Sequence, residues 1–316
     1  MRQHITRAYN SFEINASAGT ITKKSKEQRL HDEISYYQGI KGNSNEVYFP
    51  RLIGSSLDGG THQMELEYYA YDNLGDYMVY QDFNPQFWLS VAEALSSTLQ
   101  SFAGSKKQKD YSPYAEAMYI EKTERYYKEL LKLPKFKEIS EKEHLLFNGV
   151  KYLNFKHIWE DVKEQINTRL LPLEQMSIIH GDMCFSNILC GVNQKTNVCV
   201  LKFVDPRGHF GEDGIYGDPL YDYAKLVHSY HGGYEYIIYD QFQIEEDATL
   251  TEFGLSFANN NKEKIAEVFE GFHDQRSKLI EGLIYIGMCS RHYDSEDRQL
   301  AMYLTGVKTL NEALQQ

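Results

Sequence analysis

Hydrophobic and polar positions alternate over the first part of the chain and then change to a helical spacing. Residues 12–15 and 20–23 fit two short strands around a turn at residues 16–19, and residues 49–54 and 64–68 fit two more around Asp58-Gly59-Gly60. Between these pairs, apolar side chains recur at helical spacing over residues 27–39. The pattern predicts a small β-rich lobe over residues 1–75.

Helical periodicity dominates residues 76–316. An apolar stripe predicts a core-facing helix over residues 84–102, and further helices are expected over residues 113–131, 155–171, 262–291 and 296–314. Residues 104–110 are expected to form a polar loop. The exception is a pair of apolar runs, residues 188–190 and 198–204, around a turn-rich segment, which predicts a β-hairpin. The fold class is therefore α+β.

Composition limits the class of protein. A chain of 316 residues with 42% hydrophobic content buries a substantial core, and its length suggests two lobes. We find no apolar run long enough to insert into a membrane and no signal peptide, which predicts a cytoplasmic protein. The four cysteines lack paired spacing, which predicts reduced thiols. The net charge of −12 argues against broad binding to nucleic acid or to anionic membranes, and it leaves room for a local basic patch.

One short stretch carries the candidate chemistry. His180-Gly181-Asp182 follows an apolar pair, Asn187 enters the first strand of the predicted hairpin, and Asp205 leaves the second. An antiparallel hairpin places those two ends together, where an amide oxygen and a carboxylate suit Mg²⁺. Asp182, on the preceding loop, is then placed to accept a hydrogen bond from an attacking hydroxyl group. This spacing is typical of phosphoryl transfer.

The stretch resembles the catalytic loop of the aminoglycoside phosphotransferase and choline kinase family, small-molecule kinases with a protein-kinase-like fold. That loop reads His-Gly-Asp, four residues, Asn, and a metal-binding Asp follows one hairpin later. The resemblance implies a two-lobed enzyme that uses ATP and Mg²⁺ to phosphorylate a hydroxyl group of a small molecule. It implies Asp182 as the catalytic base, His180 as a loop-shaping residue, and Asn187 and Asp205 as magnesium ligands.

The resemblance also points to residues around the nucleotide. Kinases hold the α- and β-phosphates with a strand lysine paired to a helix glutamate, and Lys23 and Glu33 fit these roles, with Lys24 on the opposite strand face as the alternative. Residues 67–72 fall where such a chain crosses between lobes, so the backbone near Glu67 and Tyr69 is expected to meet the adenine. Aromatic rings there serve either base stacking or lobe packing. We find no glycine-rich kinase loop and no Walker motif, so the phosphate clamp stays unassigned.

Two acidic residues after the hairpin are expected to support the site. Gly217-Asp218-Pro219, with Asp222 following, looks like the Gly-Asp-Pro, two residues, Asp segment of the family. Asp218 suits a helix cap because Pro219 suits the first helical position. Either Asp218 or Asp222 is expected to brace the catalytic loop by hydrogen bonds instead of contacting the substrate.

The sequence leaves the acceptor open. Acidic and aromatic side chains suit a cationic amino alcohol such as choline, or an aminoglycoside. Arg207, His209 and Arg291 suit a sugar or an already phosphorylated compound. We slightly favour a sugar or polysaccharide precursor. The polar residues of the helix over residues 113–131, such as Lys122, face either an acceptor-binding cleft or water, and we favour water.

Two other functions remain as alternatives. A non-catalytic kinase-like nucleotide-binding module would not need the intact Asp182, Asn187 and Asp205. A protein kinase would need an activation segment, and Asp205 is followed by Pro-Arg with no such segment after it.

Overall fold

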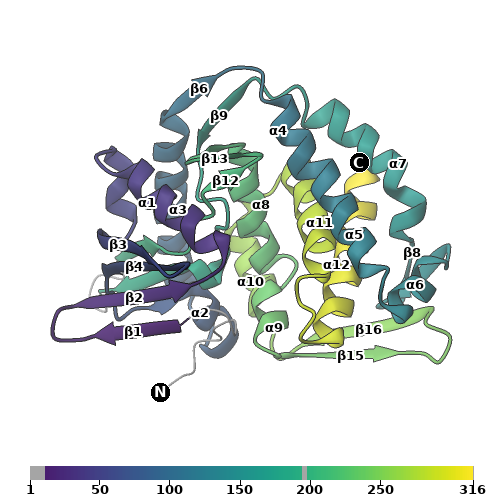
Figure 1. The fold of residues 1–316 in the computed structure, drawn as a ribbon. Coiled ribbons are helices and arrows are strands. Elements are labelled where there is room, and N and C mark those ends of the chain that lie inside the picture. The colour runs from purple at the N-terminus through teal and green to yellow at the C-terminus, as the bar shows by residue number, and fades with distance from the viewer. Residues whose placement is uncertain (1–10, 194–197, 316) are drawn as a thin grey trace.

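An antiparallel four-stranded sheet forms the N-terminal part of the computed structural model, which describes residues 11–193 and 198–315 (Figure 1). Its order is β1-β2-β4-β3, with strands β1 (Ser11–Asn15), β2 (Thr20–Ser25), β3 (Leu52–Asp58) and β4 (Thr61–Glu67). Helix α1 (Gln28–Ile40) lies against the sheet. The predicted strand at residues 49–54 begins late, at Leu52, because Phe49 is buried in the core instead.

Helices α2 (Leu74–Tyr80) and α3 (Pro85–Gly104) are drawn on the left of Figure 1, on the same side as this sheet. The other helices gather toward the centre and right of the view. They are α4 (Ser112–Glu116), α5 (Lys122–Leu130), α6 (Pro134–Ser140), α7 (Phe155–Arg169), α8 (Pro219–Tyr230), α9 (Tyr234–Ile238), α10 (Asn261–Val268), α11 (Gln275–Cys289) and α12 (Glu296–Leu314). A π-helical turn (Ala117–Glu121) joins α4 to α5, and short 3₁₀ helices cover Ser44–Tyr48, Phe185–Asn187 and Glu270–Phe272.

Short strands complete this part of the fold. They are β5 (Asp72–Asn73), β6 (Lys106–Gln108), β7 (His144–Phe147), β8 (Val150–Leu153), β9 (Gln175–Ile178), β10 (Ile188–Val192), β11 (Cys199–Phe203), β12 (His209–Phe210), β13 (Glu212–Asp213), β14 (Tyr216–Gly217), β15 (Phe242–Glu246) and β16 (Glu252–Phe257). The predicted hairpin is confirmed: β10 pairs antiparallel with β11, and β5 pairs with the other edge of β10. Residues 194–197, in the predicted turn, lie outside the described residues.

Two predictions of local structure were wrong, and one sheet was not predicted. Residues 104–110 are not only a loop, since β6 adds to the edge of β9. The helix over residues 262–291 is two helices, because Asp274 and Ser277 form a capping box that starts α11 anew. The sheet of order β15-β16-β7-β8 was not predicted, and it combines segments about 100 residues apart in the chain.

Two hydrophobic clusters flank the predicted catalytic loop, residues 180–187. One packs α5, α7, α11 and α12 together. The other holds the predicted stripe of α3, which is buried as expected and underlies the loop through the stacked rings of Trp88 and Phe185, 5.4 Å apart. Because the second cluster also includes Leu30 and Ile34 of α1, it fixes α1 against the catalytic loop.

Neither the length nor the apolarity of any described helix is sufficient to cross a membrane. All four cysteines are free thiols, as predicted. The α+β class and the division into a β-rich N-terminal and a helical C-terminal region are confirmed. The lobe boundary near residue 75 stays a prediction.

Candidate active site

The predicted catalytic loop is fixed by buried hydrogen bonds. His180 is fully buried, and its Nε2 donates to the carbonyl oxygen of Val204 at 3.0 Å while its Nδ1 accepts from the backbone N–H of Asp182 at 3.2 Å. This pattern requires the neutral imidazole with its proton on Nε2. Gly181 has a φ of +76°, and a Cβ there would lie 2.6 Å from Cβ of Arg207, so glycine is needed at this position.

Asp222 braces this loop from α8. Its two carboxylate oxygens accept hydrogen bonds from the backbone N–H groups of His180 at 2.6 Å and Gly181 at 2.8 Å. Burial raises the pKa of Asp222 to about 7. Asp218 instead caps α8 by accepting from the N–H of Leu220, and it also accepts from the Tyr119 hydroxyl at 2.7 Å. The bracing contact therefore comes from Asp222.

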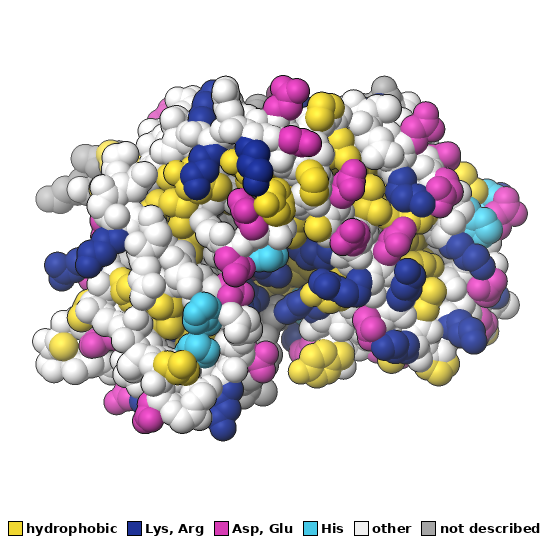
Figure 2. All heavy atoms as spheres, turned by 45° about the horizontal axis from the view of Figure 1, so that its top comes forward, with side chains coloured by type: hydrophobic (Ala, Val, Ile, Leu, Met, Phe, Trp, Pro, Cys, Tyr) yellow, Lys and Arg dark blue, Asp and Glu magenta, His cyan; other side chains and the backbone are white. Residues whose placement is uncertain are grey.

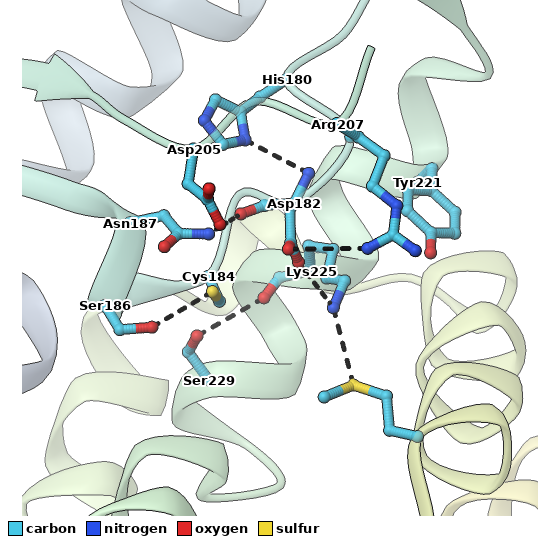
Figure 3. A network of polar contacts seen from close by, with 12 residues as sticks. His180, Asp182, Cys184, Ser186, Asn187, Asp205, Arg207, Tyr221, Lys225 and Ser229 are labelled. Carbon is cyan, nitrogen blue, oxygen red and sulfur yellow. Dashed lines mark hydrogen bonds and ion pairs between the residues drawn. The ribbon is translucent and has the colours of Figure 1, made fainter. Parts of the chain in front are cut away.

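The open end of the hairpin brings Asn187 and Asp205 beside the loop (Figure 3). The N–H of Val204 donates to the Asn187 carbonyl oxygen at 3.0 Å, which closes this end. The Asn187 side-chain Nδ2 donates to the carbonyl oxygen of Asp182 at 2.9 Å. Asp205 has a φ of +60°, a strained conformation for a residue with a Cβ, and such strain is concentrated at functional sites.

Lys23, and not Lys24, reaches the site. Lys23 Nζ lies 2.6 Å from Glu33 Oε2 and 2.6 Å from Asp205 Oδ1. In the sheet Lys23 is opposite the buried Met64 of β4, while Lys24 is the next residue along β2 and its side chain leaves the other face. Burial raises the pKa of Glu33 to about 7, even though Lys23 opposes that rise.

Asp182 is surrounded by cations. Its carboxylate lies 2.9 Å from Lys225 Nζ, 3.1 Å from Arg29 Nη2 and 3.8 Å from Arg207 Nη1, and Figure 3 shows Arg207 and Lys225 pointing toward it. Arg29 Nη2 also lies 2.5 Å from Asp205 Oδ2 and so bridges the two carboxylates. Burial opposes ionisation of Asp182, but the charges of Lys225, Arg29 and Arg207 outweigh it and hold its pKa well below the usual range.

Three cations around the site were missed or misplaced by sequence reasoning. Arg29 lies four residues before Glu33 on α1, and this spacing alone places both on one helix face. Lys225 likewise follows Asp222 by three residues on α8. The prediction that Lys122 faces water was wrong, because its Nζ points inward and lies 3.3 Å from the Tyr221 hydroxyl.

The other candidate residues lie farther from this group. The Tyr69 hydroxyl donates to Glu67 Oε2 at 2.9 Å, and within the described chain no hydrogen bond or ion pair joins this pair to Asp182 or Asp205. Arg207 and Arg291 line a pocket with Asp182. His209 lies in the adjoining hollow and is 2.9 Å from the exposed carboxylate of Asp213.

His180 gives the site a pH dependence. Burial lowers its pKa from 6.5 to about 4, so its neutral form contributes stability that is complete above pH 6.5 and is lost as the pH falls toward 4. We expect the difference in the free energy of unfolding between wild type and His180→Gln to shrink by up to about 3 kcal/mol over that range. Urea unfolding of both proteins at several pH values measures it. A difference independent of pH would contradict the neutral, buried imidazole.

Solved structures of aminoglycoside phosphotransferases share this fold. A thermostable mutant of APH(4)-Ia, in ternary complex with AMP-PNP and hygromycin B, matches with a TM-score of 0.56 and 10% sequence identity over 94% of this chain and 86% of that chain. The GDP and kanamycin complex of APH(2")-IIIa matches with a TM-score of 0.51 and 13% identity over 98% of this chain and 90% of that chain. The predicted kinase-like fold is thereby confirmed.

No protein-family model matches the sequence, and no curated protein matches it either.

Proposed function

We propose that this chain, which has the fold of the aminoglycoside phosphotransferases, transfers phosphate from ATP with Mg²⁺ to a hydroxyl group of a small molecule. The neighbours are complexed with AMP-PNP, ADP and GDP, which supports a nucleotide as the phosphate donor. The observation that carries the proposal is the convergence of Lys23, Glu33, Asp182 and Asp205 from three distant segments into one linked group. Packing alone does not require four ionisable side chains in one place.

The residues at the hairpin end fit a magnesium ion. Asn187 uses its N–H on Asp182, which leaves its amide oxygen facing away from that bond, and none of the described residues donates a hydrogen bond to that oxygen. Asp205 stays ionised, because Arg29 and Lys23 outweigh the effect of burial and hold its pKa well below the usual range. The described chain contains no group of three His, Cys, Asp or Glu side chains that would hold a metal alone. Two oxygen ligands plus phosphate oxygens are the arrangement that Mg²⁺ favours, and the ion would neutralise charge on the phosphates.

The remaining residues have separate tasks in this proposal. Lys23, held by Glu33, binds the phosphates of the nucleotide. Asp182 accepts a hydrogen bond from the acceptor hydroxyl and aligns its oxygen with the terminal phosphorus. A new bond then forms between that oxygen and phosphorus, the bond to the ADP oxygen breaks, and the hydroxyl proton leaves toward Asp182. Because the pKa of Asp182 is low, its main contribution is to position the hydroxyl, and the proton passes on to water.

The nucleotide site is tested by thermal unfolding with and without ATP and Mg²⁺. A ligand at about 100 times its dissociation constant adds roughly 2.7 kcal/mol to the free energy of unfolding. We expect this metal-dependent stabilisation in wild type and in Lys24→Met, and its loss in Lys23→Met and Asp205→Ala. Lys24→Met is the matched control, because it removes the same charge from the neighbouring strand position.

Equal stabilisation of Lys23→Met and Lys24→Met would contradict the assignment of Lys23. The absence of any nucleotide effect on wild type would overturn the kinase proposal. Stabilisation by nucleotide with no turnover of any hydroxyl compound would favour the non-catalytic nucleotide-binding module.

A further inference from the structure

A pocket beside Asp182 is lined by many cations. It lies where the catalytic loop faces α5 and α11, and its charged lining consists of one carboxylate, Asp182, and five cationic side chains. The cations are Arg29, Lys122, Arg207, Lys225 and Arg291. Figure 2 shows Lys and Arg side chains gathered around the hollow near the middle of that face. The chain as a whole has a net charge of −12, so this concentration of positive charge is local to the pocket.

Two of the five cations already have carboxylate partners. Lys225 lies 2.9 Å from Asp182, and Arg29 contacts both Asp182 and Asp205. Lys225 and Arg29 therefore position the carboxylates of Asp182 and Asp205. These pairings do not account for the three other cations of the pocket.

Those three, Lys122, Arg207 and Arg291, have weak or neutral partners. Arg207 lies 3.8 Å from Asp182, which is too far for a hydrogen bond. Lys122 Nζ is 3.3 Å from the Tyr221 hydroxyl, and Arg291 Nη1 donates to the Tyr126 hydroxyl at 2.6 Å. Within the described part of the chain, no ion pair joins Lys122 or Arg291 to a carboxylate.

This arrangement is unfavourable without a ligand. Burial, and then the charges of Arg207 and Lys225, hold the pKa of Lys122 well below its usual range. Like charges gathered in a partly enclosed space repel one another, and buried cations are normally paired. An anion bound among Lys122, Arg207 and Arg291 would supply the missing partner, whereas an ammonium group would add to the repulsion.

We propose that the hydroxyl acceptor is itself an acid, and that its phosphate or carboxylate group binds Lys122, Arg207 and Arg291 while its hydroxyl group faces Asp182. The inference rests on the proposed kinase function, since it names the substrate class of that site. Arginine pairs with both phosphate and carboxylate through two parallel hydrogen bonds, so both acids fit the same three cations. Cationic amino alcohols and amino sugars are disfavoured by the same charges.

Inorganic phosphate is the probe for this site. Its binding is measured by calorimetry at low ionic strength with wild type, Lys122→Met and Arg291→Met. We expect the dissociation constant to rise at least tenfold in both variants. Lys128→Met and Arg276→Met, which remove exposed cations from α5 and α11, are the matched controls and should bind phosphate as wild type does. Both pocket variants should fold, because each removes a charge without a carboxylate partner.

The outcomes separate the two proposals. No phosphate binding by wild type, or equal binding by Lys122→Met and Arg291→Met, would overturn the acidic acceptor, whatever the nucleotide experiment gives. If phosphate binding depends on these two residues but nucleotide has no effect on unfolding, the anion site is supported and the proposed kinase function is contradicted. Malonate as a second probe assigns the acid: tighter phosphate binding indicates a phosphorylated acceptor, and tighter malonate binding indicates a hydroxy acid. A protein that kanamycin stabilises more than either anion would also contradict the proposal.

Discussion

An Asp182→Asn variant is expected to lose turnover by about a thousandfold while it still binds ATP and Mg²⁺. The amide keeps the shape of the side chain but lacks the negative charge that holds the acceptor hydroxyl in line and draws its proton away, and removal of such a group typically costs about 10²–10⁴-fold in rate. Lys23 and Asp205, the residues proposed to hold the nucleotide and its metal, pair with each other at 2.6 Å and not through Asp182. The measurement is steady-state ADP release with an acceptor identified from the acids named above, together with nucleotide binding for the same protein.

The variant also loses stability, because Lys225 is 4% exposed and would remain buried without its carboxylate partner. Its melting temperature must therefore be recorded, and activity compared at a temperature where both proteins are folded. Asp213→Asn is the matched control, since Asp213 is an exposed carboxylate that pairs with His209 near the same pocket. Wild-type turnover in Asp182→Asn would show that the catalytic assignment is wrong.

An Asp222→Ala variant is expected to lose about 3 kcal/mol of stability. It leaves the backbone N–H groups of His180 and Gly181 buried without an acceptor, and each such group costs roughly 1–3 kcal/mol. Chemical unfolding at pH 8 measures the loss, because Asp222, with a pKa of about 7, is then ionised in the folded protein.

Asp222→Asn tests the cause of that loss. Its single amide oxygen can accept from one of the two N–H groups, so its loss of stability should be intermediate. Glu160→Ala, which removes an exposed carboxylate from α7, should leave the free energy of unfolding nearly unchanged. If Asp222→Ala melts like wild type and yet is inactive, Asp222 acts on the substrate and not on the loop.

Local sequence patterns were sufficient for much of this fold. The stripe over residues 84–102 predicted α3 because a helix that packs on one face repeats its apolar side chains with the period of the helix. The last helix, over residues 296–314, begins and ends as predicted, since Ser295 caps it and acidic residues fill its first turn. The hairpin of β10 and β11 followed from two apolar runs around a turn, and antiparallel pairing of these runs is enough to place Asn187 beside Asp205.

Residues close together in the chain could be assigned from their spacing: the predicted catalytic loop, the two hairpin ends and the cap at Asp218. Long-range packing fixed which distant residues join them. Arg29 meets Asp182 across 153 positions, and Lys23 meets Asp205 across 182. Lys122 faces the pocket because packing of α5 against α11 sets which side of the helix is enclosed. The charge of the pocket, and with it the proposed class of acceptor, depends on these long-range contacts, which no local spacing encodes.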